Sequence, residues 1–272
     1  MKKICCILLF CAPILRGAIG AQNVKITFKT DTLVAQNPLQ KEGWTLLWHD
    51  EFDVDSIDYA HWWVQDAERK GESAYFTQRL ENVRIKNGKL LISVLKEPYK
   101  NYSYTGGLVY ASRQIDCNSY VEASLKIPKG KGFWPAFWFH GGIAPNYQEV
   151  DALETYGSQT TKVDVTNHYS DSTKTEVLHD WRRVSLKKTN GKDFDLADGL
   201  NVFGFEWTDN LVRVYLNNQL LQEINQNVPT TPMNLVLGMG VGGSAGKPNR
   251  RTPFPSTYEI DYVRVYKKNK TP

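Results

Sequence analysis

Apolar and polar residues alternate along most of the chain from residue 44 onward, as expected for half-buried β-strands. In 119–127, for example, every second residue is Val, Ala, Leu or Ile. Residues 82–94 are split by Asn87-Gly88, a pair that suits a tight hairpin turn. Further strands are expected at 202–207, 211–216, 219–224, 233–241 and 258–266. Because helical periodicity is nearly absent, the pattern predicts an all-β sandwich or jelly roll.

The composition is that of an ordinary globular protein: 41% of the 272 residues are hydrophobic and 23% are charged. These values argue against a disordered chain, a collagen-like fibre or a coiled coil. Neither an internal repeat nor a low-complexity linker is visible, so one domain is expected over residues 42–268. Residues 21–41 are weakly patterned, and they are interpreted as a lead-in segment or an edge strand.

The first twenty residues have the pattern of a secretory signal peptide. Lys2 and Lys3 precede an apolar run over 4–15, and the small residues of 18–20 favour cleavage before Ala21. The run is too short to span a bilayer, so no membrane span is expected. The protein is therefore predicted to be secreted or periplasmic. Lipoprotein anchoring at Cys11 is an alternative, although the bulky Phe10 stands where such a signal has a small residue.

Removal of residues 1–20 changes the charge and the cysteine count. Three of the 33 basic residues and none of the 29 acidic ones lie in 1–20, so the formal charge falls from +4 to +1. No basic run interleaved with aromatic residues remains, which argues against nucleic-acid binding. Cys117 is the one cysteine left, so the domain has no internal disulfide. No His/Cys cluster has the spacing of a zinc site. The protein is expected to be a monomer.

The acidic stretch at 147–156 carries the candidate chemistry. In a regular strand Glu149 and Asp151 share a face, whereas Glu154 faces the other way. A β-bulge at Ala152–Leu153 would bring Glu154 to the side of the other two carboxyls. Two carboxyls about 5–5.5 Å apart are the pair of a retaining glycosidase, and a third carboxylate between them helps to keep one proton bound.

The flanking residues favour catalysis over the alternative of a solvated, acidic strand face. Trp134 and Trp138 come shortly before the acidic stretch, in the sequence Phe-Trp-Pro-Ala-Phe-Trp-Phe. Indole rings stack on the apolar faces of sugars, so tryptophans beside carboxylates indicate carbohydrate chemistry. The pattern allows both core packing and a place in the groove for Trp138, and it favours the groove for Trp134.

Motifs along nearly the whole domain resemble glycoside hydrolase family 16, the retaining endo-β-glucanases and β-galactanases. The segment Glu149-Val-Asp-Ala-Leu-Glu154 resembles the bulged family signature. Similar segments precede and follow it in the family's order: 44–52, 82–92, 119–128, 132–138, 166–169, 205–208 and 260–266. The resemblance implies a concanavalin-like jelly roll of two antiparallel sheets with an open concave cleft, and endo-acting hydrolysis without a catalytic cofactor.

The resemblance also implies roles for single residues. Glu149 would be the nucleophile and Glu154 the acid/base, with Asp151 orienting and tuning the pair. His168 would lie on a neighbouring strand within reach of the site, unless it is a structural histidine. Family members often hold a structural calcium on the convex face, and the positions to consider here are Asp261, Gly88 and Glu51.

The segment Trp134–Trp138 and the strand that carries His168 resemble the laminarinase branch, which cuts β-1,3-glucan or mixed-linkage β-glucan. The chain departs from that branch where Gly238 replaces an expected Asn and Ser244-Ala245 replaces an expected Trp. Tyr147 is the aromatic residue nearest to the start of the signature. Arg250 lies in a basic loop, either simply solvated or able to contact anionic groups of a substrate. An endo-β-galactanase acting on agar, porphyran, carrageenan or a host O-glycan is therefore an alternative, and a non-catalytic lectin is another.

Overall fold

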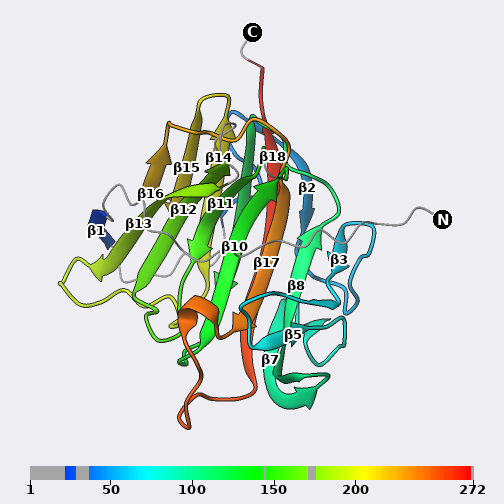
Figure 1. Ribbon diagram of the computed structural model, residues 1–272. Helices are drawn as coiled ribbons and strands as arrows, with labels where there is room; N and C mark the ends of the chain where they lie inside the picture. The colour runs from blue at the N-terminus through cyan, green and yellow to red at the C-terminus, as the bar shows by residue number, and fades with distance from the viewer. Residues whose placement is uncertain (1–21, 29–36, 144, 171–175, 271–272) are drawn as a thin grey trace.

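Two β-sheets pack face to face in the computed structural model, which describes residues 22–28, 37–143, 145–170 and 176–270 (Figure 1). Within these ranges no α-helix is present, and the one helical element is the 3₁₀ turn η1 (Gly243–Ala245). The all-β prediction is confirmed. The predicted signal peptide, including Cys11, lies outside the described residues, and among those described no helix is long and apolar enough to cross a membrane.

The first sheet, called sheet A here, carries the acidic stretch near its centre. Its strands in spatial order are β3 (Trp62–Val64), β8 (Tyr102–Ala111), β17 (Asn234–Val241), β10 (Phe133–Gly141), β11 (Gln148–Glu154), β12 (Lys162–Ser170), β13 (Val177–Lys188) and β1 (Gln22–Phe28). The pairs are antiparallel except for β1, which lies parallel to β13 at the edge. Part of the weakly patterned 21–41 segment is thus an edge strand.

The second sheet, sheet B, is built around the long strand β18 (Ser256–Lys268). On one side of β18 lie β9 (Ser119–Lys126), β14 (Asn201–Thr208), β15 (Leu211–Leu216) and β16 (Gln219–Ile224). On the other side lie β2 (Trp44–Asp50), β7 (Leu90–Tyr99) and, beyond β7, β6 (Val83–Ile85). Asn87 and Gly88 both have positive φ in the turn between β6 and β7, which agrees with the hairpin that the sequence predicts.

The alternation along the strands separates the core face of sheet A from its outer face. On β10, Phe137 and Phe139 point into the core, where Phe139 stacks on Phe205 of β14 with ring centroids 3.8 Å apart. Trp134 and Trp138 occupy the opposite parity of the same strand and therefore face outward. The side chains that could meet a substrate are on this outer face, and the buried face holds the two sheets together.

A short two-stranded segment folds over part of the outer face of sheet A. It consists of β4 (Ala67–Glu68) and β5 (Ala74–Phe76), and β5 pairs with β8 (Figure 1). The Phe76 ring packs with Tyr110 and Trp138 in a small apolar cluster. This β4–β5 segment forms a wall on the β8 side of the acidic strand.

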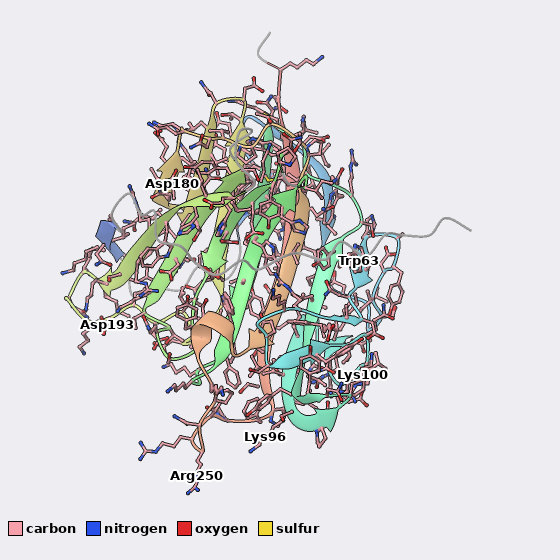
Figure 2. The ribbon with its side chains drawn as sticks, viewed as in Figure 1. Trp63, Lys96, Lys100, Asp180, Asp193 and Arg250 are labelled. Carbon is pink, nitrogen blue, oxygen red and sulfur yellow. The ribbon has the colours of Figure 1, made fainter. Side chains whose placement is uncertain are left out.

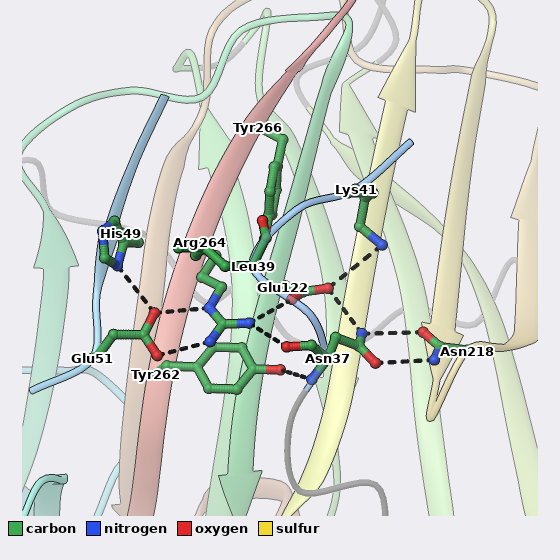
Figure 3. A network of polar contacts seen from close by, with 10 residues as sticks. All are labelled: Asn37, Leu39, Lys41, His49, Glu51, Glu122, Asn218, Tyr262, Arg264 and Tyr266. Carbon is green, nitrogen blue, oxygen red and sulfur yellow. Dashed lines mark hydrogen bonds and ion pairs between the residues drawn. The ribbon is translucent and has the colours of Figure 1, made fainter. Parts of the chain in front are cut away.

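A charge network ties residues 37–41 to the outer face of sheet B (Figure 3). Arg264 donates two 2.8 Å hydrogen bonds to the Glu51 carboxylate and one of 2.7 Å to the backbone oxygen of Asn37. Glu122 is fully buried, accepts a 3.0 Å hydrogen bond from the Asn37 amide and lies 3.6 Å from Lys41. Buried ions of this kind are stable only as a paired set.

One of the three predicted calcium positions, Glu51, belongs to this network. Glu51 directly follows β2 and is held by Arg264, Gly88 is in the β6–β7 turn, and Asp261 is in β18. The ion pair with Arg264 already compensates the charge of Glu51. Calcium binding remains a prediction.

Replacement of Arg264 by leucine should be strongly destabilising, because Glu51 would lose the guanidinium that holds it and the buried Glu122 would keep only Lys41 as a cationic neighbour. The expected loss in the free energy of unfolding is about 3–5 kcal/mol, measured by urea denaturation. The matched control is Arg213→Leu, which breaks an exposed pair with Glu223 and should cost less than about 1 kcal/mol. Equal losses for the two variants would contradict this view of the network.

Candidate active site

A β-bulge in β11 places three carboxyl groups on the outer face of sheet A. Against β10, Leu153 pairs with Phe137 and Asp151 pairs with Trp138, so Ala152 is the extra residue. The register against β12 shifts at the same place, between Asp151 and Glu154. Ala152 and Leu153 are both fully buried, whereas Glu154 is partly exposed. The bulge predicted at Ala152–Leu153 is therefore present, and it turns Glu154 to the side of Glu149 and Asp151.

Each of these carboxyls has a distinct polar partner. The Tyr147 hydroxyl donates a hydrogen bond to Glu149 Oε2. His168 Nε2 lies 3.1 Å from Asp151 Oδ2 and 3.6 Å from Glu149 Oε1. At the other end of the ladder, Trp134 Nε1 donates a 2.7 Å hydrogen bond to Glu154 Oε1. The groups are held at fixed positions before any substrate binds.

Burial and like charge separate the titration of the acidic groups. Desolvation, together with the negative charge of Asp151, raises the pKa of Glu154 to about 8. Desolvation and Glu149 raise the pKa of Asp151 to about 6, although His168 opposes the rise. Glu154 therefore holds a proton at neutral pH while Asp151 is ionised. This is the difference in protonation that an acid catalyst beside a carboxylate requires.

The charge of His168 follows from its acidic neighbours. Burial lowers the pKa of its imidazole, but the hydrogen bond to Asp151 and the nearby Glu149 outweigh this and raise the pKa to about 9. The side chain is then an imidazolium at neutral pH and bridges two carboxylates. Glu149, Asp151 and His168 form the one group of three potential metal ligands found among the described residues. The imidazolium already supplies a positive charge there.

Comparison with known proteins decides the family. The model of glycosyl hydrolases family 16 matches residues 70–264, which contain the whole acidic ladder. The chain belongs to glycosyl hydrolase family 16. It is an O-glycoside hydrolase of this family, and the sequence resemblance and its jelly-roll expectation are confirmed.

Relatives of this family 16 chain include glucanases, and a similar solved structure is described among O-glycanases. A β-glucanase of Rhodothermus marinus is 28% identical over 252 residues, covering 82% of this chain and 85% of that protein. The endo-β-1,3-glucanase structure from Pyrococcus furiosus has a TM-score of 0.75 at 28% identity, covering 84% and 96% of the two chains. A structure described among endo-acting O-glycanases of the human gut microbiota, which initiate mucin breakdown, has a TM-score of 0.76 at 26% identity, covering 85% and 93%.

The tryptophans and Tyr147 that the sequence singled out all lie beside the carboxyls of this family 16 site. Trp134 is partly exposed and packs edge-on against Tyr156, with ring centroids 6.1 Å apart. Trp138 faces the same way but is 6% exposed, because the β4–β5 segment covers it. Trp138 therefore lies on the same face as the carboxyls and also packs in a buried apolar cluster, so it combines features of the groove and core-packing alternatives.

Arg250 lies apart from these residues. It projects from the tip of the loop that follows η1, away from the strands (Figure 2). The side chain is exposed. A contact of Arg250 with substrate remains a prediction.

The sequence analysis missed several side chains on the same face. Strand pairing aligns a row of residues across sheet A, from one edge of the family 16 site to the other: Trp63, Tyr110, Val236, Trp138, Asp151, Thr166 and Trp181. Arg69 and Glu72 from the β4–β5 segment and His140 from β10 also reach this face. The alternation within each strand could have shown the face, but not which strands are neighbours.

The protonation of Glu154 makes its effect on stability depend on pH. Its pKa in the folded state is about 8 against an ordinary 4.5, so the folded state holds this proton more tightly than the unfolded state. The resulting stabilisation is complete below about pH 4.5 and disappears as the pH rises toward 8. We therefore expect Glu154→Gln to be more stable than wild type at pH 9, on the order of a few kcal/mol, with a smaller difference at pH 4. Urea denaturation at both pH values measures this, and a difference that does not change with pH would contradict it.

Proposed function

We propose that the chain is a secreted, retaining endo-β-glucanase that cleaves internal bonds of β-1,3- or mixed-linkage β-1,3/1,4-glucan. Glu149 is the nucleophile, Glu154 is the acid/base, and Asp151 orients Glu149 through the shared His168. The observation that carries the proposal is the bulged ladder, in which the Glu154 carboxyl, whose pKa is raised to about 8, lies on the same face of one short strand as Glu149 and Asp151. The names of the glucanase relatives support the substrate class.

In the first step Glu149 attacks the anomeric carbon and Glu154 gives its proton to the departing glycosidic oxygen, forming a covalent glycosyl-enzyme. In the second step the ionised Glu154 takes a proton from water, which attacks the same carbon and releases Glu149. The Trp134 hydrogen bond stays on Glu154 and holds the carboxyl in position, first for the departing glycosidic oxygen and then for the attacking water. Two displacements at one carbon return the β-configuration.

The tryptophans and tyrosines of the outer face support carbohydrate binding in this proposal. Trp134 is partly exposed beside Glu154, at the place where the leaving sugar would lie. Trp181 on β13 continues the row on the far side of Asp151. Aromatic faces along the row suit the apolar faces of β-linked hexoses, so a polysaccharide can cross the strands at this level.

A host O-glycan is the second candidate substrate, because the O-glycanase structure is as similar to this chain as the glucanase structure is. A substrate panel separates the two: laminarin, mixed-linkage glucan, agarose, porphyran, carrageenan and mucin O-glycans, with products sized by mass spectrometry. The proposal expects laminarin or mixed-linkage glucan to give a ladder of short oligosaccharides. Products from mucin O-glycans alone would favour the O-glycanase function.

A lectin without activity is tested in the same experiment with Glu149→Gln. If the wild type binds a glucan yet releases no more reducing sugar than this variant, the chain is a binding protein. The proposed enzyme instead releases reducing ends with the wild type and not with the variant.

A further inference from the structure

Strand pairing places an ion pair directly beside the Glu154 carboxyl. Glu154 of β11 is opposite Asp164 of β12, and Asp164 is opposite Arg183 of β13. The three side chains therefore form one row across neighbouring strands of sheet A (Figure 1). Directly opposed residues of an antiparallel pair have Cβ atoms about 4.5–5.5 Å apart, so the Asp164 carboxylate is a close neighbour of the acid/base carboxyl.

The guanidinium of Arg183 holds Asp164 by a two-point contact. Arg183 Nε donates a 2.7 Å hydrogen bond to Asp164 Oδ1, and Nη2 donates one of 2.6 Å to Oδ2. Asp164 is 3% exposed, so this contact is largely shielded from water. The guanidinium also lies over two aromatic rings, 5.0 Å from the centre of Trp181 and 5.9 Å from that of Tyr156. An arginine held in this way has little freedom to move, and it keeps Asp164 as a carboxylate.

Several charged or titratable groups face Glu154, and the ion pair acts among them. They lie on β11, β12 and β13 and just after β11: Asp151, Asp164, His168, Arg183 and Tyr156. From β10 the neutral Trp134 indole donates its hydrogen bond. Burial is the largest cause that raises the pKa of Glu154, and the negative charges of Asp151 and Asp164 add to it, while His168 lowers the pKa.

Arg183 acts on Glu154 in the opposite direction to Asp164. The hydrogen bond with Asp164 is the largest cause that raises the pKa of the guanidinium, and the charge of Glu154 also contributes. Attraction between Arg183 and an ionised Glu154 favours loss of the proton, whereas repulsion by Asp164 favours its retention. The nearer group in the row is Asp164, because it is directly opposite Glu154 and Arg183 is one strand further away.

We propose that the Asp164–Arg183 ion pair positions the catalytic proton: the Asp164 carboxylate keeps the proton on Glu154, and the Arg183 guanidinium prevents Asp164 from taking that proton itself. The inference rests on the acid/base role of Glu154 in the proposed function. Both residues act through Glu154, so they are positioning residues. Without Arg183, two neighbouring carboxyls would compete for one proton, as in a carboxylate dyad. The pair thus sets the upper pH limit of the step in which the leaving group is protonated.

Two nearly isosteric variants remove one charge each, and the proposal predicts pH shifts of opposite sign. The readout is the midpoint of the alkaline decline of kcat/KM on glucan, expected at about pH 8 for the wild type. Asp164→Asn should lower the midpoint by about 1–2 pH units, because Arg183 then acts on Glu154 without compensation. This is a loss of roughly 5–50-fold at pH 8, with activity within about threefold of wild type at pH 5.5. Arg183→Gln should instead raise the midpoint by about 0.5–1 pH unit.

Further measurements separate the effect of charge from structural damage. The double variant Asp164→Asn/Arg183→Gln removes both charges, so its midpoint should fall between those of the single variants. Glu223→Gln is the matched control, because Glu223 and Arg213 are likewise an ion pair of opposed residues, on sheet B. Its midpoint should equal that of the wild type. An aryl glycoside with a strongly acidic phenol should show no alkaline decline in its first step in any of these proteins.

A ¹³C NMR titration of labelled glutamate carboxyls measures the same shifts without turnover, with Glu154→Gln assigning the signal of Glu154. An unchanged midpoint in Asp164→Asn, or shifts of the same sign in both single variants, would overturn the proposal. A failure of the proposed function is distinguishable, because Glu154→Gln would then lose activity equally on glucan and on the aryl glycoside. The NMR titration would in that case still report whether the ion pair holds the proton on Glu154.

Discussion

Glu149→Ala should abolish hydrolysis of glucan, with a loss in kcat of at least ~10⁴-fold, because the covalent intermediate cannot form. Added azide should restore part of the activity on an aryl β-laminaribioside, since the shortened side chain leaves room for a small anion at the α-face of the sugar. Azide then attacks the anomeric carbon, the aryl oxide leaves, and the product is the α-glycosyl azide. The rate of aryl release and the NMR spectrum of the product measure the result.

Glu223→Ala is the control for this prediction, because Glu223 is an exposed carboxylate of β16 that pairs with Arg213 on the other sheet. It should hydrolyse glucan at the wild-type rate, with or without azide. A Glu149→Ala enzyme that azide does not rescue, or that yields the β-glycosyl azide, would be inconsistent with attack by Glu149 from the α-face.

Glu154→Gln should separate substrates by their leaving groups. Natural glucan needs a proton on the departing oxygen, so we expect its hydrolysis to fall by roughly 10³-fold or more. An aryl glycoside with a strongly acidic phenol needs no such proton, and its first step should proceed at near the wild-type rate. A burst of phenol followed by slow turnover is expected, because the second step still lacks the general base.

The pH dependence of natural-substrate hydrolysis supplies a second readout for Glu154. Its pKa of about 8 in the folded protein predicts that kcat/KM declines above that pH, as the proton is lost. The activated substrate should not show this alkaline decline in its first step. Equal losses of activity on both substrates in Glu154→Gln would contradict the acid/base role.

The acidic ladder could be predicted from the sequence because the information is local. Two carboxyls at alternate positions and a third one position out of phase require one extra residue, and Ala152 is that residue. The burial of Leu153 supplies the energetic reason, since a regular strand would expose this leucine and turn Glu154 into the core. The hairpin at Asn87-Gly88 was predictable for the same kind of reason.

The wall on the β8 side of the site was not predictable, because it depends on contacts between distant segments. Arg69 and Trp138 are adjacent only because β8, β17 and β10 are neighbours in the sheet, and because β5 pairs with β8. Nothing in the alternation of a single strand specifies these neighbours. His140 was likewise indistinguishable from any outward-facing residue until its pairing with Glu149 was known.

The Arg264 network shows a further limit of the local pattern. Glu122 reads as the polar side of an alternating strand, and a solvated position is the natural expectation. In the structure it is fully buried under residues 37–41, whose location on sheet B no periodicity indicates (Figure 3). Its burial becomes understandable only when Arg264 and Asn37 are placed beside it.

The most direct test of the catalytic assignment is to trap the glycosyl-enzyme. A 2-deoxy-2-fluoro-β-laminaribiosyl fluoride forms the intermediate quickly and hydrolyses slowly, because the fluorine at C2 destabilises the oxocarbenium-like transition state of both steps. Peptide mass spectrometry of the inactivated protein should find one disaccharide on the peptide that contains Gln148–Glu154, with fragmentation placing it on Glu149. A label on Glu154, or turnover of glucan by a protein that never acquires a label, would contradict the account.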